Sequence, residues 1–282
     1  MTRFLIVTAD DFGLSGAVNE AVEQANKRGI LTAASLMVSE PGAADAIRRA
    51  RMLPDLRVGL HLVLADGAAT LAAELIPALA QADGRMNEHM IAKSFRFFAS
   101  PAVRRQLEAE VGAQFAAYAR TGLALDHVNV HKHFHLHPTV LEVVLRVGQK
   151  FGLRALRVPD EPLWFAAHGG AWVEAAKKVS LMPWIAMMKK RLRKAGVLCN
   201  DRIFGIAATG KMSEEKLLAV MARLPPGISE IYLHPACDSE EHAALLSPRL
   251  LAAAVAARVS RGGYSDALML RSREHAARDK LW

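Results

Sequence analysis

Short apolar segments alternate with amphipathic segments along this chain, and several of the apolar segments end in ionisable residues. Short apolar runs are typical of buried strands, and the amphipathic segments between them predict connecting helices. This alternation implies an α/β fold built on a parallel sheet. The predicted strands are 4–9, 32–38, 57–64, 125–135, 154–158, 203–206 and 228–233, the predicted helices are 15–27, 43–51, 101–120, 139–151, 213–223 and 247–261, and a loop with short helices is expected at 68–99.

Ionisable residues gather at the ends of the predicted strands. In parallel α/β folds the carboxyl ends of the strands carry the active site. Taken singly, the aspartate pair fits a solvated turn or a helix cap, His61 a core histidine, and the dipeptide at 234–235 a strand-ending turn. Their convergence at four strand ends favours one common site. The candidate residues are Asp10, Asp11, His61, His131 and His234.

Four histidines occupy alternate positions from His131 to His137. Alternate residues of a strand share one face, and imidazoles are costly to bury there without partners. The usual partner is a divalent metal. A solvated basic strand edge is the alternative, and the interrupted, internal run argues against a purification tag. His133 and His135 share the predicted face of His131, so they are alternative ligands.

One carboxylate and two histidines are a common ligand set for a catalytic divalent cation. Such a cation polarises a carbonyl and activates water, while a neighbouring carboxylate takes a proton and a histidine protonates the leaving amine. Histidine-rich sites suit zinc, and a mixed oxygen and nitrogen shell admits magnesium or manganese. The sequence therefore favours a metal-dependent hydrolase.

The 282-residue chain has a formal net charge of +8, and much of the excess lies in one segment. We expect a single barrel domain over residues 1–282, with an inserted basic amphipathic segment at about 160–201 whose helical part covers 172–194. Cations interleaved with Trp, Met and Leu favour an anionic membrane surface or a nucleic acid, and an ordinary surface helix is the alternative. The cations are Lys177, Lys178, Lys189, Lys190, Arg191, Arg193 and Lys194. No nucleic-acid motif accompanies them, so we expect no nucleic-acid partner.

Two cysteines, Cys199 and Cys237, lie far apart in the sequence, which favours a reducing compartment without disulfide bonds. The sequence contains no apolar run of about 18 residues that would predict a membrane-spanning helix. We therefore expect a cytoplasmic protein that attaches peripherally to the inner face of the membrane.

Four motifs resemble those of the YdjC-like carbohydrate deacetylases and occur in the same order. They are the segments at residues 8–13, 59–61, 125–135 and 233–236. The resemblance implies a distorted (β/α) barrel of the polysaccharide-deacetylase type. It also implies removal of an acetyl group from an N-acetylated amino sugar with one divalent cation, magnesium or zinc.

The same resemblance implies roles for individual residues. The implied metal ligands are Asp11, His61 and His131. Asp10 matches the general base, and we assign the general acid to His234 because it ends a different strand. Arg157 is expected either to orient a carboxylate or a sugar hydroxyl of the substrate, or to cap a helix at the surface. Asn129 stands where many members have aspartate, which removes a possible orienting partner of His131.

Residues 125–138, residues 154–162 and the basic insertion resemble the hopanoid biosynthesis-associated branch called HpnK. That resemblance implies N-acetylglucosamine linked to a hopanoid lipid as the substrate. Soluble N-acetylated oligosaccharides are one alternative substrate. Outside this family, a metal-dependent phosphoesterase or amidohydrolase and a non-catalytic nucleic-acid binder are the alternative functions.

Overall fold

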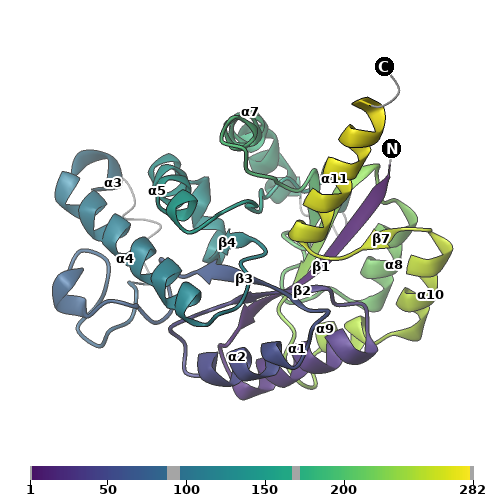
Figure 1. The fold of residues 1–282 in the computed structure, drawn as a ribbon, viewed down its shortest axis with the longest axis horizontal. Coiled ribbons are helices and arrows are strands. Elements are labelled where there is room, and N and C mark those ends of the chain that lie inside the picture. The colour runs from purple at the N-terminus through teal and green to yellow at the C-terminus, as the bar shows by residue number, and fades with distance from the viewer. Residues whose placement is uncertain (1, 88–95, 167–171, 280–282) are drawn as a thin grey trace.

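A curled sheet of parallel strands forms the centre of the protein (Figure 1). The computed structural model describes residues 2–87, 96–166 and 172–279. Within these ranges the strand order is β4-β3-β2-β1-β6-β5, and β7 also pairs with β1. The strands are β1 (Arg3–Phe12), β2 (Ala33–Leu36), β3 (Arg57–Leu62), β4 (Val128–Val130), β5 (Arg202–Phe204), β6 (Gly227–Leu233) and β7 (Ser260–Arg261).

The two edges of the sheet approach each other through a segment with little regular structure. Leu156 forms an isolated parallel bridge with Val128 of β4, and Ala155 forms another with Leu198. The backbone N–H of Ile203 in β5 donates to the carbonyl of Asp160. The strand predicted at 154–158 is therefore reduced to isolated bridges, but these carry the sheet round from β4 towards β5 as a distorted barrel.

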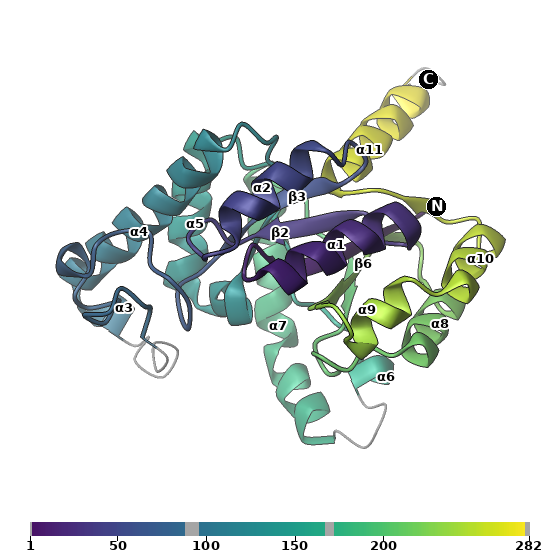
Figure 2. The same ribbon diagram turned by 90° about the horizontal axis from the view of Figure 1, so that it is seen from below.

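Helices surround the sheet, with α3 and α4 at one end of the molecule and α8 and α10 at the other (Figures 1 and 2). Serine side chains begin several of them: Ser15, for example, accepts a hydrogen bond from the N–H of Val18. The helices are α1 (Gly16–Arg28), α2 (Ala43–Arg51), α3 (Arg96–Ala99), α4 (Pro101–Arg120), α5 (Pro138–Lys150), α6 (Leu163–Ala166), α7 (Trp172–Lys194), α8 (Glu214–Ala222), α9 (Glu240–Leu245), α10 (Pro248–Ala256) and α11 (Tyr264–Asp279), with short 3₁₀ helices at Ala73–Leu75 and His131–Leu136.

Alternate residues of β1 enter two different environments. Leu5 and Val7 belong to the large apolar core, whereas Phe4 and Ile6 belong to a second, smaller apolar cluster that includes residues from five other segments. Thr8 continues the inward row and donates to a buried carboxylate on β6. The barrel interior is therefore apolar near the amino ends of the strands and polar near their carboxyl ends.

The histidine-rich segment is not a strand, so the predicted strand at 125–135 is wrong beyond β4. His131–Leu136 forms a 3₁₀ helix in which Lys132 and His133 have φ values of 54° and 52°. Left-handed backbone conformations end the two-residue periodicity of a strand. The four imidazoles therefore do not share one strand face.

The carboxyl-terminal part of the chain also differs from the prediction. The helix expected at 247–261 ends at Ala256, after which β7 and α11 follow. α11 begins beside the segment that leads into β4, because Asp126 accepts hydrogen bonds from the backbone N–H groups of Tyr264 and Ser265. That anchor lies far away in the sequence, so local patterns could not show it.

The basic insertion contains α7, whose bounds match the predicted helical segment at 172–194. Within the described ranges, no helix combines the length and the apolar character needed to cross a bilayer.

Candidate functional site

A bulge at the carboxyl end of β1 directs two consecutive aspartates into neighbouring parts of one site. Consecutive side chains of a regular strand point to opposite faces. The pairing of β1 with β2 shifts register between Ala9 and Phe12, and Asp11 has a left-handed φ of 60°. Asp11 consequently faces two histidines, while Asp10 remains inside the barrel.

Asp11, His61 and His131 bring three ligand atoms into a compact triangle. Asp11 Oδ1 lies 3.2 Å from His61 Nε2 and 3.4 Å from His131 Nδ1. The two ring nitrogens are 3.1 Å apart. Three ligands at about 2.1 Å from one cation, with angles of about 90–110° between them, would have separations of about 3.0–3.4 Å. The structure thus brings together all three predicted ligands.

These donor atoms suit a cation. Asp11 Oδ1 is buried and, among the described residues, no donor meets it with hydrogen-bond geometry. A buried carboxylate oxygen without a donor is costly unless a cation or water faces it. A carboxylate with two imidazoles is a donor set that divalent cations accept. Within the described ranges, this is the one group of three such side chains close enough to share an ion.

The charges around the triangle also favour a cation. Burial would raise the pKa of Asp11, but its contacts with His131 and His61 outweigh burial and hold that pKa well below the usual range. Burial would lower the pKa of His61, but the carboxylates of Asp10 and Asp11 raise it above the usual value. The negative potential that attracts a proton to His61 would attract a metal ion in the same way.

Asn129 decides which nitrogen of His61 is free. It is the neighbour of His61 on β4, and its Nδ2 donates to Asp10 Oδ1 at 2.9 Å. A carboxylate can only accept, so Asn129 Oδ1 is the atom that faces His61 Nδ1, at 2.6 Å. His61 Nδ1 therefore carries the hydrogen, and Nε2 presents a lone pair to the triangle. Asparagine at position 129 predicts the loss of an orienting partner for His131; in the structure the Asn129 side chain contacts His61 instead.

Arg157 is fully buried and connects Asp10 to Glu230. Its Nη1 and Nη2 donate to Asp10 Oδ2 at 2.5 Å and Oδ1 at 2.9 Å, and its Nη2 and Nε donate to Glu230 at 2.8 and 3.1 Å. Burial alone would raise the pKa of Asp10, but the Arg157 guanidinium holds it well below the usual range. The alternative of a surface arginine is wrong: Arg157 orients a carboxylate of the protein itself.

His234 follows β6 and lies near both aspartates. Its charge contributes to the lowered pKa values of Asp10 and Asp11. Its backbone N–H donates to Glu241 Oε2 at 2.6 Å, which fixes the turn after the strand. His234 Nδ1 is buried and has no hydrogen-bond partner within the described part of the chain. One ring nitrogen is therefore available to a substrate or to water.

The two alternative histidine ligands have other partners. His133 Nε2 lies 3.3 Å from the hydroxyl of Tyr232. His135 Nε2 donates to the carbonyl of Arg157 at 2.8 Å. Burial lowers the pKa of His135 to about 4, so its ring is neutral at pH 7. Neither histidine belongs to the ligand triangle.

Sequence reasoning missed the polar side chains that support the site from inside the barrel. Glu230, inside the otherwise apolar strand 228–233, was an available signal, because a charge buried in a strand requires a partner of opposite charge. The serine and asparagine in the other strands gave no comparable signal. The missed residues are Ser35, Asp126, His127, Asn129, Glu230 and Tyr264.

Fold and site together define an α/β barrel protein with a candidate single-metal centre at the carboxyl ends of its strands. The YdjC-like protein family matches residues 4–276, and the chain belongs to that family. A carbohydrate deacetylase from Geobacillus stearothermophilus is 32% identical over 245 residues, which cover 79% of this chain and 94% of that protein. A carbohydrate deacetylase from Brevibacillus brevis is 36% identical over 163 residues, which cover 57% of this chain and 59% of that protein.

Solved structures confirm the predicted fold class. One is from Enterococcus faecalis V583 and carries the provisional name cellobiose-phosphate cleavage protein. It superposes with a TM-score of 0.76 at 22% identity, over 94% of this chain and 99% of that chain. The Xyl-CE4 domain of a multidomain xylanase from the hindgut metagenome of Trinervitermes trinervoides superposes with a TM-score of 0.50 at 8% identity, over 96% and 92% of the two chains.

Proposed function

We propose that this chain uses one divalent cation to hydrolyse the acetyl amide of an N-acetylated amino sugar. The triangle of Asp11, His61 and His131 beside Asp10 carries the proposal, because these side chains can hold a cation and leave positions open for substrate. Membership of the YdjC-like family and the two relatives named carbohydrate deacetylases support the substrate class.

The protein's own groups suit the proton transfers of amide hydrolysis. A divalent cation at the triangle would polarise the amide carbonyl and make nearby water more acidic. Asp10 Oδ2 receives one hydrogen bond, from Arg157, so a lone pair remains to take the proton of the attacking water. His234 would give a proton to the amine nitrogen as the C–N bond breaks, and acetate and a free amino sugar would leave.

A two-metal phosphoesterase is the second candidate. Two-metal sites hold their ions about 3.5–4 Å apart and require further ligands beyond one carboxylate and two histidines. The part of the chain that the structure describes offers one such ligand group. A single-metal amide hydrolase is therefore favoured, and the number of metal ions bound per chain distinguishes the two.

The test is acetate release by purified protein that has been stripped of metal and reloaded with zinc or magnesium. Substrates are N-acetylglucosamine oligomers and an N-acetylglucosaminyl lipid in detergent, and Asp11→Ala is the matched control. We expect acetate from the reloaded wild type and none from the control. Absence of acetate from every acetylated sugar would contradict the proposal.

We propose further that the acetylated sugar is carried by a lipid, such as a hopanoid, and that α7 meets the membrane surface. Apolar side chains of this helix remain in solvent: Val179, Leu181, Met182 and Met187 are 37–53% exposed. Exposed cations follow in its last turns. Each cation near anionic headgroups contributes about 1 kcal/mol, and inserted apolar side chains add to it.

The opposite face of α7 packs against the protein, as the inner face of an ordinary surface helix does. Ile185, Met188 and Leu192 are buried against the core. Lys189 is also unavailable to lipid, because its Nζ donates to Asp160 at 2.5 Å and to the carbonyl of Asp201 at 2.7 Å. A membrane contact would thus use only the outer face of the helix.

Co-sedimentation with anionic liposomes at low salt tests this contact. The variant replaces Lys190, Arg191, Arg193 and Lys194 with glutamine and leaves the Lys189 ion pair intact. We expect binding by the wild type, weaker binding at high salt and weaker binding by the variant. A wild type that ignores the liposomes would favour a soluble acetylated oligosaccharide as the substrate.

A further inference from the structure

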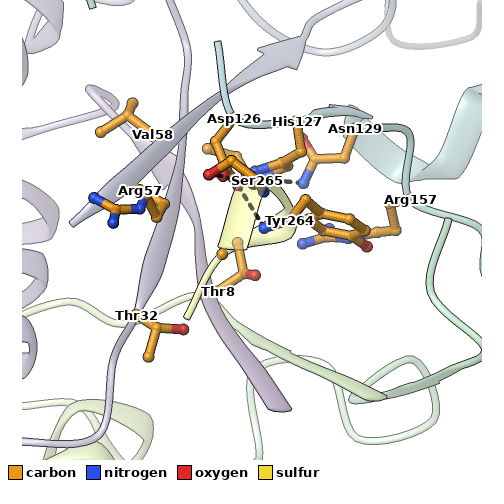
Figure 3. Close-up of polar contacts among 12 residues, drawn as sticks. Thr8, Thr32, Arg57, Val58, Asp126, His127, Asn129, Arg157, Tyr264 and Ser265 are labelled. Atoms are coloured by element: carbon orange, nitrogen blue, oxygen red, sulfur yellow. Dashed lines mark hydrogen bonds and ion pairs between the residues drawn. The ribbon is translucent and has the colours of Figure 1, made fainter. Parts of the chain in front are cut away.

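A buried aspartate–histidine pair lies inside the barrel, behind the candidate metal centre, and Figure 3 shows it between β3 and the start of α11. Asp126 Oδ2 is 2.9 Å from His127 Nδ1. The other contacts of Asp126 come from α11, where Tyr264 and Ser265 donate from their backbone N–H groups at 3.0 and 2.8 Å. The Tyr264 ring also packs against the His127 ring, with centroids 5.2 Å apart. These contacts hold the imidazole in one place.

The contact with Asp126 shows which nitrogen of His127 carries a hydrogen. Burial would raise the pKa of Asp126, but the hydrogen bond from His127 and the other donors lower it, so this carboxylate is ionised at neutral pH. An ionised carboxylate can only accept hydrogen bonds. His127 Nδ1 therefore carries a hydrogen, and Nε2 is the ring nitrogen that contacts Ser35. That Nε2 lies 2.9 Å from Ser35 Oγ.

Ser35 joins the pair to the polar groups that support the metal centre. The single hydroxyl hydrogen of Ser35 faces two partners, Asp10 Oδ1 at 3.2 Å and His127 Nε2 at 2.9 Å. In either orientation Ser35 Oγ accepts from Asn129 Nδ2 at 2.8 Å. Asn129 thus finds two acceptors on its amino side, Ser35 Oγ and Asp10 Oδ1. Its carbonyl oxygen is left for His61 Nδ1 at 2.6 Å, which leaves His61 Nε2 facing Asp11.

Gly59 makes this connection possible. Ser35 on β2 pairs with Gly59 on β3, and β3 separates β2 from β4, which His127 directly precedes. A Cβ atom at position 59 would lie 2.6 Å from three atoms of the His127 ring. The imidazole therefore crosses β3 through the space that the missing side chain leaves.

We propose that His127 is a positioning residue for the deacetylase reaction, acting through Ser35 and Asn129 on the metal ligand His61. Its kinetic consequence rests on the proposed function, but its effect on the metal centre does not. Loss of a residue that hydrogen-bonds to a metal ligand commonly changes metal affinity or activity by about 10–100-fold. His127 is connected to His61 through two intervening side chains, those of Ser35 and Asn129. We expect a change near tenfold in zinc affinity and in kcat, with KM within about twofold of wild type.

Two substitutions separate positioning from packing. Glutamine at this position can place its amide group near the site of Nε2 and hydrogen-bond to Ser35 in either direction, whereas the shorter asparagine reaches only the site of Nδ1. His127→Gln should therefore retain most of the zinc affinity and kcat, and His127→Asn should lose both. A packing role alone predicts similar losses in the two variants.

The experiment measures zinc dissociation constants by titration of the metal-free variants, ¹⁵N chemical shifts of the histidines in the zinc-loaded proteins, and acetate release. His61 in wild type and His127→Gln should show a protonated Nδ1, and His127→Asn should show mixed tautomers. Ser35→Ala leaves Asp126 and the α11 contacts intact, so it should reproduce the His127→Asn loss even if His127→Asn fails to fold. The double variant should be no worse than either single variant.

Wild-type zinc affinity and an unchanged His61 tautomer in Ser35→Ala or in folded His127→Asn would overturn the inference. Additive losses in the double variant would overturn it as well. Neither the zinc titration nor the ¹⁵N measurement needs a substrate. A chain that releases no acetate but shows the expected zinc and ¹⁵N changes would therefore contradict the proposed function and leave this inference supported.

Discussion

Arg157 and Asp10 face each other inside the barrel as a two-pronged ion pair. Nη1 and Nη2 of the guanidinium donate to Oδ2 and Oδ1 of the carboxylate at 2.5 and 2.9 Å. Both side chains are buried, and Glu230 is a second carboxylate that contacts the same guanidinium. The pair holds the candidate base in one orientation, because the planar fork of arginine matches both carboxylate oxygens.

Replacing Arg157 tests how far the site depends on this fork. Arg157→Met would leave two buried carboxylates without a cation, and we expect a loss of about 3–5 kcal/mol in the free energy of unfolding. Arg157→Lys keeps the charge but not the fork, so it should be less destabilised and still lose turnover. Denaturant unfolding and acetate release measure the two effects. Equal stability of Arg157→Met and wild type would show that the ion pair does not support the fold.

The ligand triangle and the candidate base should respond differently to substitution. His131→Ala should lose zinc, because one of three ligands disappears, whereas Asp10→Asn should keep zinc and lose about 100-fold or more in kcat. Equilibrium dialysis and acetate release measure these outcomes. His133→Ala is the control, since its ring lies in the same segment but faces Tyr232. Zinc bound normally by His131→Ala would contradict the ligand assignment.

The choice of metal follows from the same side chains. Two imidazole nitrogens and one carboxylate suit zinc better than magnesium, which prefers an oxygen shell. We expect zinc to bind in preference to magnesium when both ions are added to the metal-free protein at equal concentrations. Isothermal titration with each ion, alone and in competition, checks this, and tighter binding of magnesium would show that groups other than the triangle hold the ion.

The contribution of Asp126 to the free energy of unfolding should depend on pH. Its folded-state pKa lies below the usual value, so its contribution is present above the unfolded-state pKa of about 3.9 and is lost as the pH falls through the folded-state pKa. Asp126→Asn should therefore cost about 1–3 kcal/mol at pH 7, and the difference from wild type should shrink below about pH 4. Unfolding curves of both proteins from pH 7 to pH 3 provide the measurement. A difference that grows on acidification would have the wrong sign.

Gly59 offers a test by addition of one methyl group. Gly59→Ala would press a Cβ atom into the His127 ring, so we expect a loss of about 1–3 kcal/mol in stability and weaker zinc binding. Gly112→Ala is the matched control: it lies within α4, and a Cβ atom there would meet nothing within 4 Å. That control should be stabilised by about 0.5–1 kcal/mol. Similar stability and zinc binding of the two variants would show that the His127 ring does not need the space left by the missing side chain at Gly59.

The sequence by itself predicted the α/β class, most of the strand and helix positions, and the residues that meet at the candidate metal centre. These follow from local patterns, since apolar runs and amphipathic periods mark the elements. Polar residues at the ends of parallel strands converge whatever the details of the loops. The candidate residues at the strand ends could therefore be found before any contact was known. The resemblance to the family then singled out Asp11, His61 and His131 as the ligands.

Only the tertiary structure decided which buried side chains support these three residues. Arg157 is buried because its partners Asp10 and Glu230 lie 147 and 73 residues away in the sequence, and no local pattern reports such a pairing. α11 is anchored by Asp126, which is 138 residues from Tyr264. The histidine run shows the opposite failure: its alternation imitates a strand, but left-handed conformations at Lys132 and His133 turn it into a 3₁₀ helix. Periodicity records which residues share a face, whereas hydrogen bonds between distant segments are set by strand register and backbone conformation, which appear only once the chain has folded.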